Sequence, residues 1–131
     1  MVVKKRILIV DDEPGIGKVL RIEFSLSGYD VTTTTSGAEA IELIRNQEPD
    51  IVLLDILMPD VTGMDVLSEV RTFSRVPIIV FTGHAEMGCA ALKIGASDYI
   101  TKPFNHELLM DKVKSALNEV KHEKRRGTKT G

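Results

Sequence analysis

The stretch that most constrains the fold is 51–59 (IVLLDILMP), an uninterrupted apolar run that ends in Asp55 and a turn before Pro59. A strand that is apolar on both faces suits the centre of a parallel sheet, because helices cover such a sheet on each side and neither face meets water. The strand therefore brings Asp55 to the edge of the sheet at which it ends. Taken alone, Asp55 could equally well start the turn, so its role depends on what else reaches that edge.

Apolar, strand-like runs alternate with helical patterns five times along the chain. The runs are 7–10, 30–34, 51–54, 77–81 and 97–101. This alternation predicts a doubly wound α/β fold of the (βα)5 type, a five-stranded parallel sheet with helices on both faces. We adopt the strand order 2-1-3-4-5 from flavodoxin-like folds, because the alternation does not itself determine the order. The Thr-rich run 30–34 suits an edge strand.

The helices are placed from their caps and their apolar spacing. Ser36 is expected to cap the second helix, with Glu39 three residues later completing a capping box. The third helix is expected to carry Met64, Leu67, Val70 and Phe73, and the fourth Met87, Ala90, Ala91 and Ile94. The single cysteine, Cys89, excludes an internal disulfide and a zinc cluster, and its Ala-rich surroundings predict a small core residue.

The length of 131 residues is that of one domain. No apolar run approaches the length of a membrane span, and the N-terminus leads directly into a strand, so we expect a cytoplasmic protein without membrane contact. Residues 121–131 carry a net charge of +4 against -6 for the remainder, and we interpret them as a basic tail or linker stub after a domain of residues 1–120. The body has neither a basic face nor interleaved aromatic residues, so direct nucleic-acid binding is not expected.

Polar side chains follow four of the predicted strands. They are Asp11, Asp12, Asp55, Thr82 and Lys102. Because parallel strands all end at one edge, and because these four strands are neighbours in the adopted order, the side chains are expected in a single cleft. Each of them has an ordinary explanation as a helix cap or an exposed charge. Their joint placement at four strand ends favours a functional site.

Three carboxylates that meet in one cleft require a cation, because two carboxylates about 4 Å apart repel each other by several kcal/mol at a protein surface. A site of oxygen ligands without His or Cys indicates Mg²⁺, which keeps several waters and binds carboxylates beside a phosphate. A carboxylate, a metal, a hydroxyl and a lysine together predict phosphoryl transfer onto Asp55. Lys102 would neutralise phosphoryl oxygens and Thr82 would donate a hydrogen bond to one of them.

This set of residues resembles the receiver domain of bacterial two-component response regulators, over roughly residues 5–120. The segments that carry the resemblance are 11–14 (DDEP), 55–59 (DILMP) with Gly63, 82–83 (TG) and 95–104 (GASDYITKPF). Any one of these segments would be weak evidence. As an ordered set they are highly specific.

The resemblance implies a signalling switch rather than a turnover enzyme. Asp55 would accept a phosphoryl group from a sensor histidine kinase or a phosphotransfer protein. Asp12 would bind Mg²⁺ directly and Asp11 through water, while Asp55 and the backbone carbonyl of Leu57 would supply further ligands. Lys102 would pair with the phosphate.

The resemblance also implies a switch pair, Thr82 and Tyr99. When the hydroxyl of Thr82 moves to the phosphate, Tyr99 would turn inward and repack the face formed by the fourth helix, the last strand and the fifth helix. That face would control an output partner that the sequence does not name. The protein would be a monomer or a weak, phosphorylation-linked dimer through the same face. A cis bond before Pro103 would aim Lys102 into the site.

The chain departs from the family pattern at two places. The connector from Thr82 to Gly95 is shorter than the usual one, which leaves the length of the fourth helix open. Leu57 and His84 occupy the two positions that tune attack of water on the acyl phosphate. Leu57 is apolar and cannot orient water, so slow self-dephosphorylation is expected, whereas His84 could act in the opposite direction.

Two alternative functions remain open. A Mg-dependent aspartyl-phosphate hydrolase, similar to haloacid dehalogenase-type enzymes, would need a second Asp two residues after the nucleophile as general acid, where this chain has Leu57. The other alternative is a receiver-like interaction module that no longer takes phosphate. Labelling of Asp55 with a phosphodonor separates all three functions.

Overall fold

The computed structural model describes the backbone of residues 3–130 and the side chains of residues 3–118. Five strands alternate with five helices. They are β1 (Arg6–Val10), α1 (Pro14–Leu26), β2 (Asp30–Thr34), α2 (Gly37–Gln47), β3 (Ile51–Asp55), α3 (Gly63–Val70), β4 (Ile78–Thr82), α4 (Ala85–Ile94), β5 (Asp98–Thr101) and α5 (His106–Thr130). All strand pairs are parallel and the order is β2-β1-β3-β4-β5, which confirms the predicted fold class and topology.

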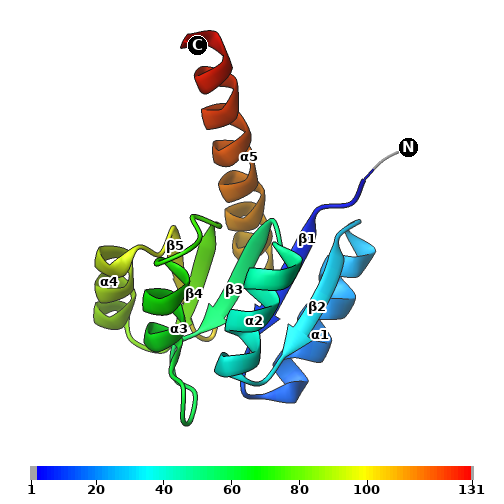
Figure 1. Ribbon diagram of the computed structural model, residues 1–131. Coiled ribbons are helices and arrows are strands. Elements are labelled where there is room, and N and C mark those ends of the chain that lie inside the picture. Colours follow the sequence, from blue (N-terminus) through cyan, green and yellow to red (C-terminus); the bar gives the residue numbers. More distant parts are fainter. Residues whose placement is uncertain (1–2, 131) are drawn as a thin grey trace.

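The sheet separates two hydrophobic cores (Figure 1). Every residue of β3 and β4 is buried, as a central strand between two helical layers requires. Alternate strand residues point to opposite faces. Leu8, Val10, Val52 and Leu54 pack under α2, α3 and α4, whereas Ile7, Ile9, Ile51 and Leu53 pack under α1 and α5. The Thr-rich β2 lies at the edge of the sheet as predicted.

Two of the helices begin at well-defined caps. The side chain of Ser36 accepts a hydrogen bond from the backbone N–H of Glu39 at 3.1 Å, which confirms the predicted cap of α2. The predicted capping box is not completed, because the backbone N–H of Ser36 donates to Oγ1 of Thr34 at 3.1 Å rather than to Glu39. Thr62 and Asp65 form a reciprocal capping box at the start of α3. A Cβ atom at Gly63 would lie 2.1 Å from the backbone oxygen of Asp55, so only glycine lets α3 begin against the end of β3.

Two other expectations about the helices are wrong. α3 ends at Val70 rather than reaching Phe73, because the N–H groups of Thr72 and Phe73 turn back to carbonyl oxygens three residues earlier and close the helix. Cys89 is exposed on α4 rather than buried in the core. The buried positions of α4 are Gly88 and Ala91, so the face that meets the sheet is displaced from the one that the apolar residues indicate.

The short connector after β4 does not prevent a full fourth helix, since α4 spans ten residues. α5 continues to Thr130, past the domain boundary expected at residue 120, and extends beyond the edge of the sheet in Figure 1. The side chains of the basic tail lie outside the described residues, so the tail or linker role stays a prediction. Within the described part of the chain, none of the helices combines the length and the apolar character needed to cross a membrane.

Candidate functional site

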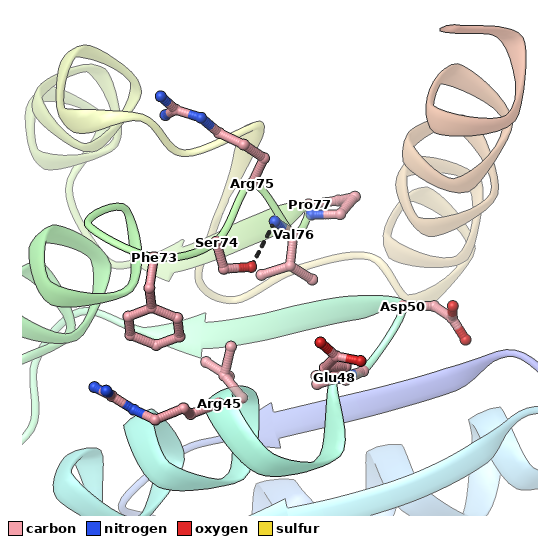
Figure 2. Close-up of a pocket in the computed structure, with 10 residues that line it drawn as sticks. Arg45, Glu48, Asp50, Phe73, Ser74, Arg75, Val76 and Pro77 are labelled. Carbon is pink, nitrogen blue, oxygen red and sulfur yellow. Dashed lines mark hydrogen bonds between the residues drawn. The ribbon is translucent and has the colours of Figure 1, made fainter. Parts of the chain in front are cut away.

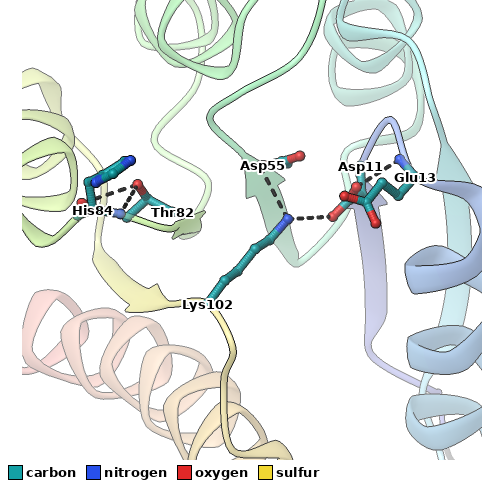
Figure 3. A network of polar contacts seen from close by, with 6 residues as sticks. All are labelled: Asp11, Glu13, Asp55, Thr82, His84 and Lys102. Atoms are coloured by element: carbon teal, nitrogen blue, oxygen red, sulfur yellow. Dashed lines mark hydrogen bonds and ion pairs between the residues drawn. The ribbon is translucent and has the colours of Figure 1, made fainter.

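The ends of four strands place the candidate residues at one edge of the sheet. Asp11 directly follows β1, Asp55 and Thr82 end β3 and β4, and Lys102 directly follows β5. Figure 3 shows Lys102 reaching across the ends of the strands toward the acidic side chains. Asp11, Asp55 and Thr82 are buried, with only 2%, 4% and 1% of their surface exposed. Carboxylates that are this deeply buried need partners, which the neighbouring strands supply.

Lys102 bridges two of the carboxylates. Its Nζ lies 3.3 Å from Oδ2 of Asp11 and 3.5 Å from Oδ1 of Asp55. Burial alone would lower the pKa of Lys102, but the two carboxylates outweigh burial and the net pKa is raised. The lysine is therefore fully charged at neutral pH. The other oxygen of Asp11, Oδ1, accepts a hydrogen bond from the backbone N–H of Glu13 at 2.9 Å.

The three carboxylates form a compact donor set. One oxygen from each of Asp11, Asp12 and Asp55 lies within 4.8 Å of the others. Burial, together with the negative charge of Asp11, raises the pKa of Asp55 from 3.8 to about 6 in spite of the lysine. The single ammonium group of Lys102 does not balance the charge of three carboxylates. A hard divalent cation with oxygen ligands, above all Mg²⁺, fits this donor set.

Thr82 lies at the end of β4 with its hydroxyl held locally. Its Oγ1 accepts a hydrogen bond from the backbone N–H of His84 and lies within donating distance of the His84 carbonyl, both at 3.1 Å. The backbone N–H of Lys102 donates to the carbonyl oxygen of Thr82 at 2.8 Å, so the two residues are tied through the backbone as well. The hydroxyl of Thr82 is thus engaged by the backbone of His84.

The remaining predicted residues lie further from the acidic cluster. Tyr99 is half-buried on β5 against the core that α2, α3 and α4 cover. The nearby thiol of Cys89 raises the pKa of Tyr99. The side chain of His84 is 61% exposed beside Glu86, and Leu57 is 56% exposed. Neither side chain is fixed against the acceptor. The bond between Lys102 and Pro103 is cis, as predicted.

A groove beside the acidic cluster was not predicted from the sequence. It has a volume of about 470 Å³ and a mostly apolar lining. The residues that define it are Ile16, Val19 and Leu20 of α1 with Lys102, Phe104 and His106. Val19 is 48% exposed there although it shares the helical spacing of core residues. The pattern of apolar residues marks the face of α1, but it does not distinguish a face that is covered from one that stays open.

A second hollow of about 460 Å³ lies at the opposite edge of the sheet, where β3 and β4 begin (Figure 2). The guanidinium of Arg45 lies 4.4 Å from the ring centre of Phe73 and 4.0 Å from Glu69. Figure 2 shows Glu48 on the lower side of the hollow and Arg75 directed away from it. Its charges are of both signs and Arg45 is engaged within the fold. The candidate functional site is therefore the edge with Asp55, where the acidic cluster lies.

Comparison with known proteins assigns the family. Residues 7–114 match the model of the response regulator receiver domain. The chain belongs to this family of two-component signalling proteins. One relative, described as the probable transcriptional regulator ycf27 of Guillardia theta, is 40% identical over 116 residues, which is 87% of this chain and 46% of the relative. The chain thus spans about half the length of the curated relatives that it matches.

Solved structures agree with this assignment. A CheY-like response regulator receiver domain protein from Methanospirillum hungatei is 33% identical, with a TM-score of 0.86 over 92% of this chain and 99% of the other. The BeF3-activated receiver domain of Klebsiella pneumoniae RstA is 30% identical, with a TM-score of 0.82 over 86% of this chain and 98% of the other. The family is one of phosphoacceptor switches, the class that the sequence favoured over a hydrolase.

Because the pKa of Asp55 is raised, the metal-free protein should become less stable as the pH rises. Between pH 4 and 6 the folded state binds more protons at Asp55 than the unfolded state, so the free energy of unfolding falls as the pH rises through this window. Asp55→Asn should therefore stabilise the metal-free protein above pH 6 by about 1–3 kcal/mol and have little effect below pH 4.

Urea denaturation at several pH values in EDTA measures this difference. Asp111→Asn, at an exposed position of α5, is the matched control and should stay within about 0.5 kcal/mol of the wild type throughout. Equal stability of Asp55→Asn and the wild type at pH 7.5 would contradict the prediction.

Proposed function

We propose that this receiver domain accepts a phosphoryl group on Asp55 from a sensor histidine kinase or a phosphotransfer protein. The observation that carries the proposal is the position of Asp55. It is a buried carboxylate at the end of the central strand, in contact with Lys102 and within reach of two further carboxylates. A catalytic nucleophile and its neutralising groups are expected in this arrangement.

In the proposed transfer, a carboxylate oxygen of Asp55 attacks the phosphorus atom and an acyl phosphate forms. The bond from phosphorus to the donor nitrogen breaks, and its electron pair returns to the imidazole of the donor. Lys102 lies 3.5 Å from Asp55, where its charge can stabilise the oxygens of the transferred group. Asp11 and Asp12, with the backbone carbonyl of Leu57, would hold Mg²⁺. A bound Mg²⁺ supplies charge neutralisation at the phosphoryl oxygens.

The proposed output of the reaction is a shift between two packings of the same fold. Thr82 would release His84 and donate to the phosphoryl group. Tyr99 would then leave its position against α4, which changes the surface formed by α4, β5 and α5. A phosphorylated chain needs to favour the active packing by about 5.5 kcal/mol to move from 1:99 to 99:1. One buried anion that gains Lys102 and a hydroxyl can supply a difference of this order.

The apolar groove between α1 and the segment after β5 is proposed to receive the phosphodonor protein. Lys102 lies in its lining, so a partner in the groove is placed beside the acceptor. The hydrogen bond between His106 Nδ1 and Glu23 Oε2, at 2.6 Å, joins α5 to α1 at this side of the domain. Val19 and Ile22, which are 48% and 60% exposed, extend the apolar surface along α1. An amphipathic helix of the donor suits such a surface.

The proposed output is control of transcription through an attached domain or a partner protein. It rests on relatives that are named transcriptional regulators and are about twice as long as this chain. The receiver domain would act as a monomer or as a weak dimer that phosphorylation favours. A hydrolase remains the less suitable function, because the position that needs a general acid is occupied by Leu57, whose side chain cannot transfer a proton.

Incubation with Mg²⁺ and a small phosphodonor should add one phosphoryl group to the wild type and none to Asp55→Asn. Intact-mass measurement checks this, and EDTA should prevent the label. Asp111→Asn, the surface control, should label as the wild type does. Continuous release of phosphate from phosphate esters, without accumulation of the label, would favour the hydrolase instead. Absence of the label under all conditions would favour the interaction module.

The phosphoryl group on Asp55 should persist for minutes or longer at neutral pH, because the exposed Leu57 cannot orient a water molecule for attack. Replacement of this side chain by a polar one, Leu57→Asn, should increase the rate of phosphate loss by about tenfold, within the range typical of positioned polar groups. The decay of the mass-labelled species over time measures both rates. Loss of phosphate from the wild type within seconds would refute the prediction.

Val19→Glu should affect phosphoryl transfer from a protein donor but not transfer from a small phosphodonor. A charge in the groove should slow transfer from a phosphorylated histidine kinase by about tenfold or more, as for loss of an interface anchor. Labelling by a small phosphodonor should be unchanged, because Val19 does not contact the acceptor. Leu92→Glu on α4, where the native side chain is similarly exposed at 41%, is the control that should transfer normally. Equal slowing of both donors would rule out a docking role.

A further inference from the structure

Gly88, in the second turn of α4, lies directly under the ring of Tyr99. A Cβ atom at this position would lie 2.3 Å from Cδ2 and 2.5 Å from Cγ of the tyrosine ring. Carbon atoms in contact are about 3.5–4.0 Å apart, so any side chain at Gly88 would exclude the ring from its present position. Glycine in the middle of a helix is otherwise unfavourable by about 1 kcal/mol relative to alanine. The ring therefore occupies space that only this residue type leaves free.

The neighbouring Cys89 lies beside the other end of the same ring. The thiol of Cys89 lies near the tyrosine hydroxyl and raises the pKa of Tyr99. Gly88 supplies the flat surface for the ring and Cys89 lies near the hydroxyl, and the two are consecutive residues of one helix. Tyr99 thus packs on α4, while the hydroxyl of Thr82 is engaged by His84.

α4 is fixed at its C-terminal end by contacts outside the phosphoryl site. Nε of Arg71 donates to the carbonyl oxygen of Gly95 at 2.9 Å, and Nη1 donates to that of Ser74 at 3.1 Å. Its N-terminal end begins three residues after Thr82, and the hydroxyl of Thr82 is bonded to the backbone of His84. Besides the packing of Met87 against the core, the first half of α4 is linked to Thr82 through the backbone of His84 and to Tyr99 through Gly88. Both links involve the residues that respond to phosphorylation in the proposed switch.

We infer that Gly88 is the positioning residue that keeps the receiver in its unphosphorylated packing, by giving the ring of Tyr99 a place on α4. The inference rests on the proposed function and deepens it, since it states what holds the switch in the resting state. Loss of this place removes the packing of the Tyr99 ring on α4. Gly88→Ala should then shift the resting protein toward the packing that phosphorylation favours. By reciprocity, the variant should bind a phosphoryl analogue more tightly.

The two tyrosines of the chain make the shift measurable. Uniform labelling with 3-fluorotyrosine gives two ¹⁹F signals, which Tyr29→Phe assigns. Tyr29 packs against Phe24 in the other core and serves as the internal reference. Titration of the wild type with Mg²⁺ and beryllofluoride defines the activated position of the Tyr99 signal. In Gly88→Ala, without any analogue, this signal should move toward that position, and the beryllofluoride affinity should rise about fivefold or more.

Gly17→Ala is the matched control, because Gly17 is also a buried glycine in a helix. A Cβ atom there would lie 3.8 Å from Thr33, which is an ordinary contact, so neither signal should move beyond its local effect. Cys89→Ala is a second test that keeps the fold, since Cys89 is exposed. It should shift the Tyr99 signal in the same direction by a smaller amount. An unchanged Tyr99 signal in both the Gly88 and Cys89 variants overturns the inference, as does unchanged affinity for beryllofluoride.

Failure of this inference is distinguishable from failure of the proposed function. If Asp55 does not accept phosphate, the wild type and Gly17→Ala also fail to label and to bind beryllofluoride. If only the role of Gly88 is wrong, all variants label on Asp55, and Gly88→Ala gives the affinity and the Tyr99 signal of the wild type.

Discussion

The burial of Asp55 beside Asp11 is the constraint on which the rest of the structure depends. Two carboxylates with almost no exposed surface are unfavourable in a protein interior unless a positive charge reaches them. Lys102 provides that charge from a position 91 residues away from Asp11 in the sequence. The parallel order of the strands makes this possible, because β1, β3, β4 and β5 all end at the same edge. The three carboxylates still outnumber the single ammonium group, so the cluster can bind a cation, alone or together with a ligand.

Features that depend on neighbouring residues in the sequence could be predicted, whereas features that depend on distant contacts could not. The strands and their alternation with helices were predicted, because apolar runs and capping residues act locally. The gathering of Asp11, Asp55, Thr82 and Lys102 was also predicted, but only after the strand order had been adopted from a known class of fold. The raised pKa of Asp55 could not be predicted, since it depends on burial and on the distances between charges.

The orientation of α4 was harder to predict from the sequence, because it also depends on contacts with distant residues. The exposure of Cys89 and the burial of Gly88 depend on how α4 is rotated on the sheet. The apolar pattern of a short, Ala-rich helix determines this rotation poorly, because alanine is compatible with either environment. A glycine within a helical pattern is the one local sign that something lies close to the backbone, and it is informative only when the partner is known. The early end of α3 likewise follows from turn hydrogen bonds rather than from the spacing of apolar residues.

The separation of the two cores by the sheet has a consequence for how such a domain evolves. The groove beside Lys102 is built on the side of α1 and α5, whereas Tyr99 and α4 pack on the side of α2 and α3. Substitutions in the proposed donor groove therefore lie on the opposite side of the sheet from the proposed resting contact of Tyr99. Duplicated copies of the gene could diverge in their choice of kinase, and so avoid cross-talk, while they retain the same threshold of response. Selection can act on the two properties one at a time.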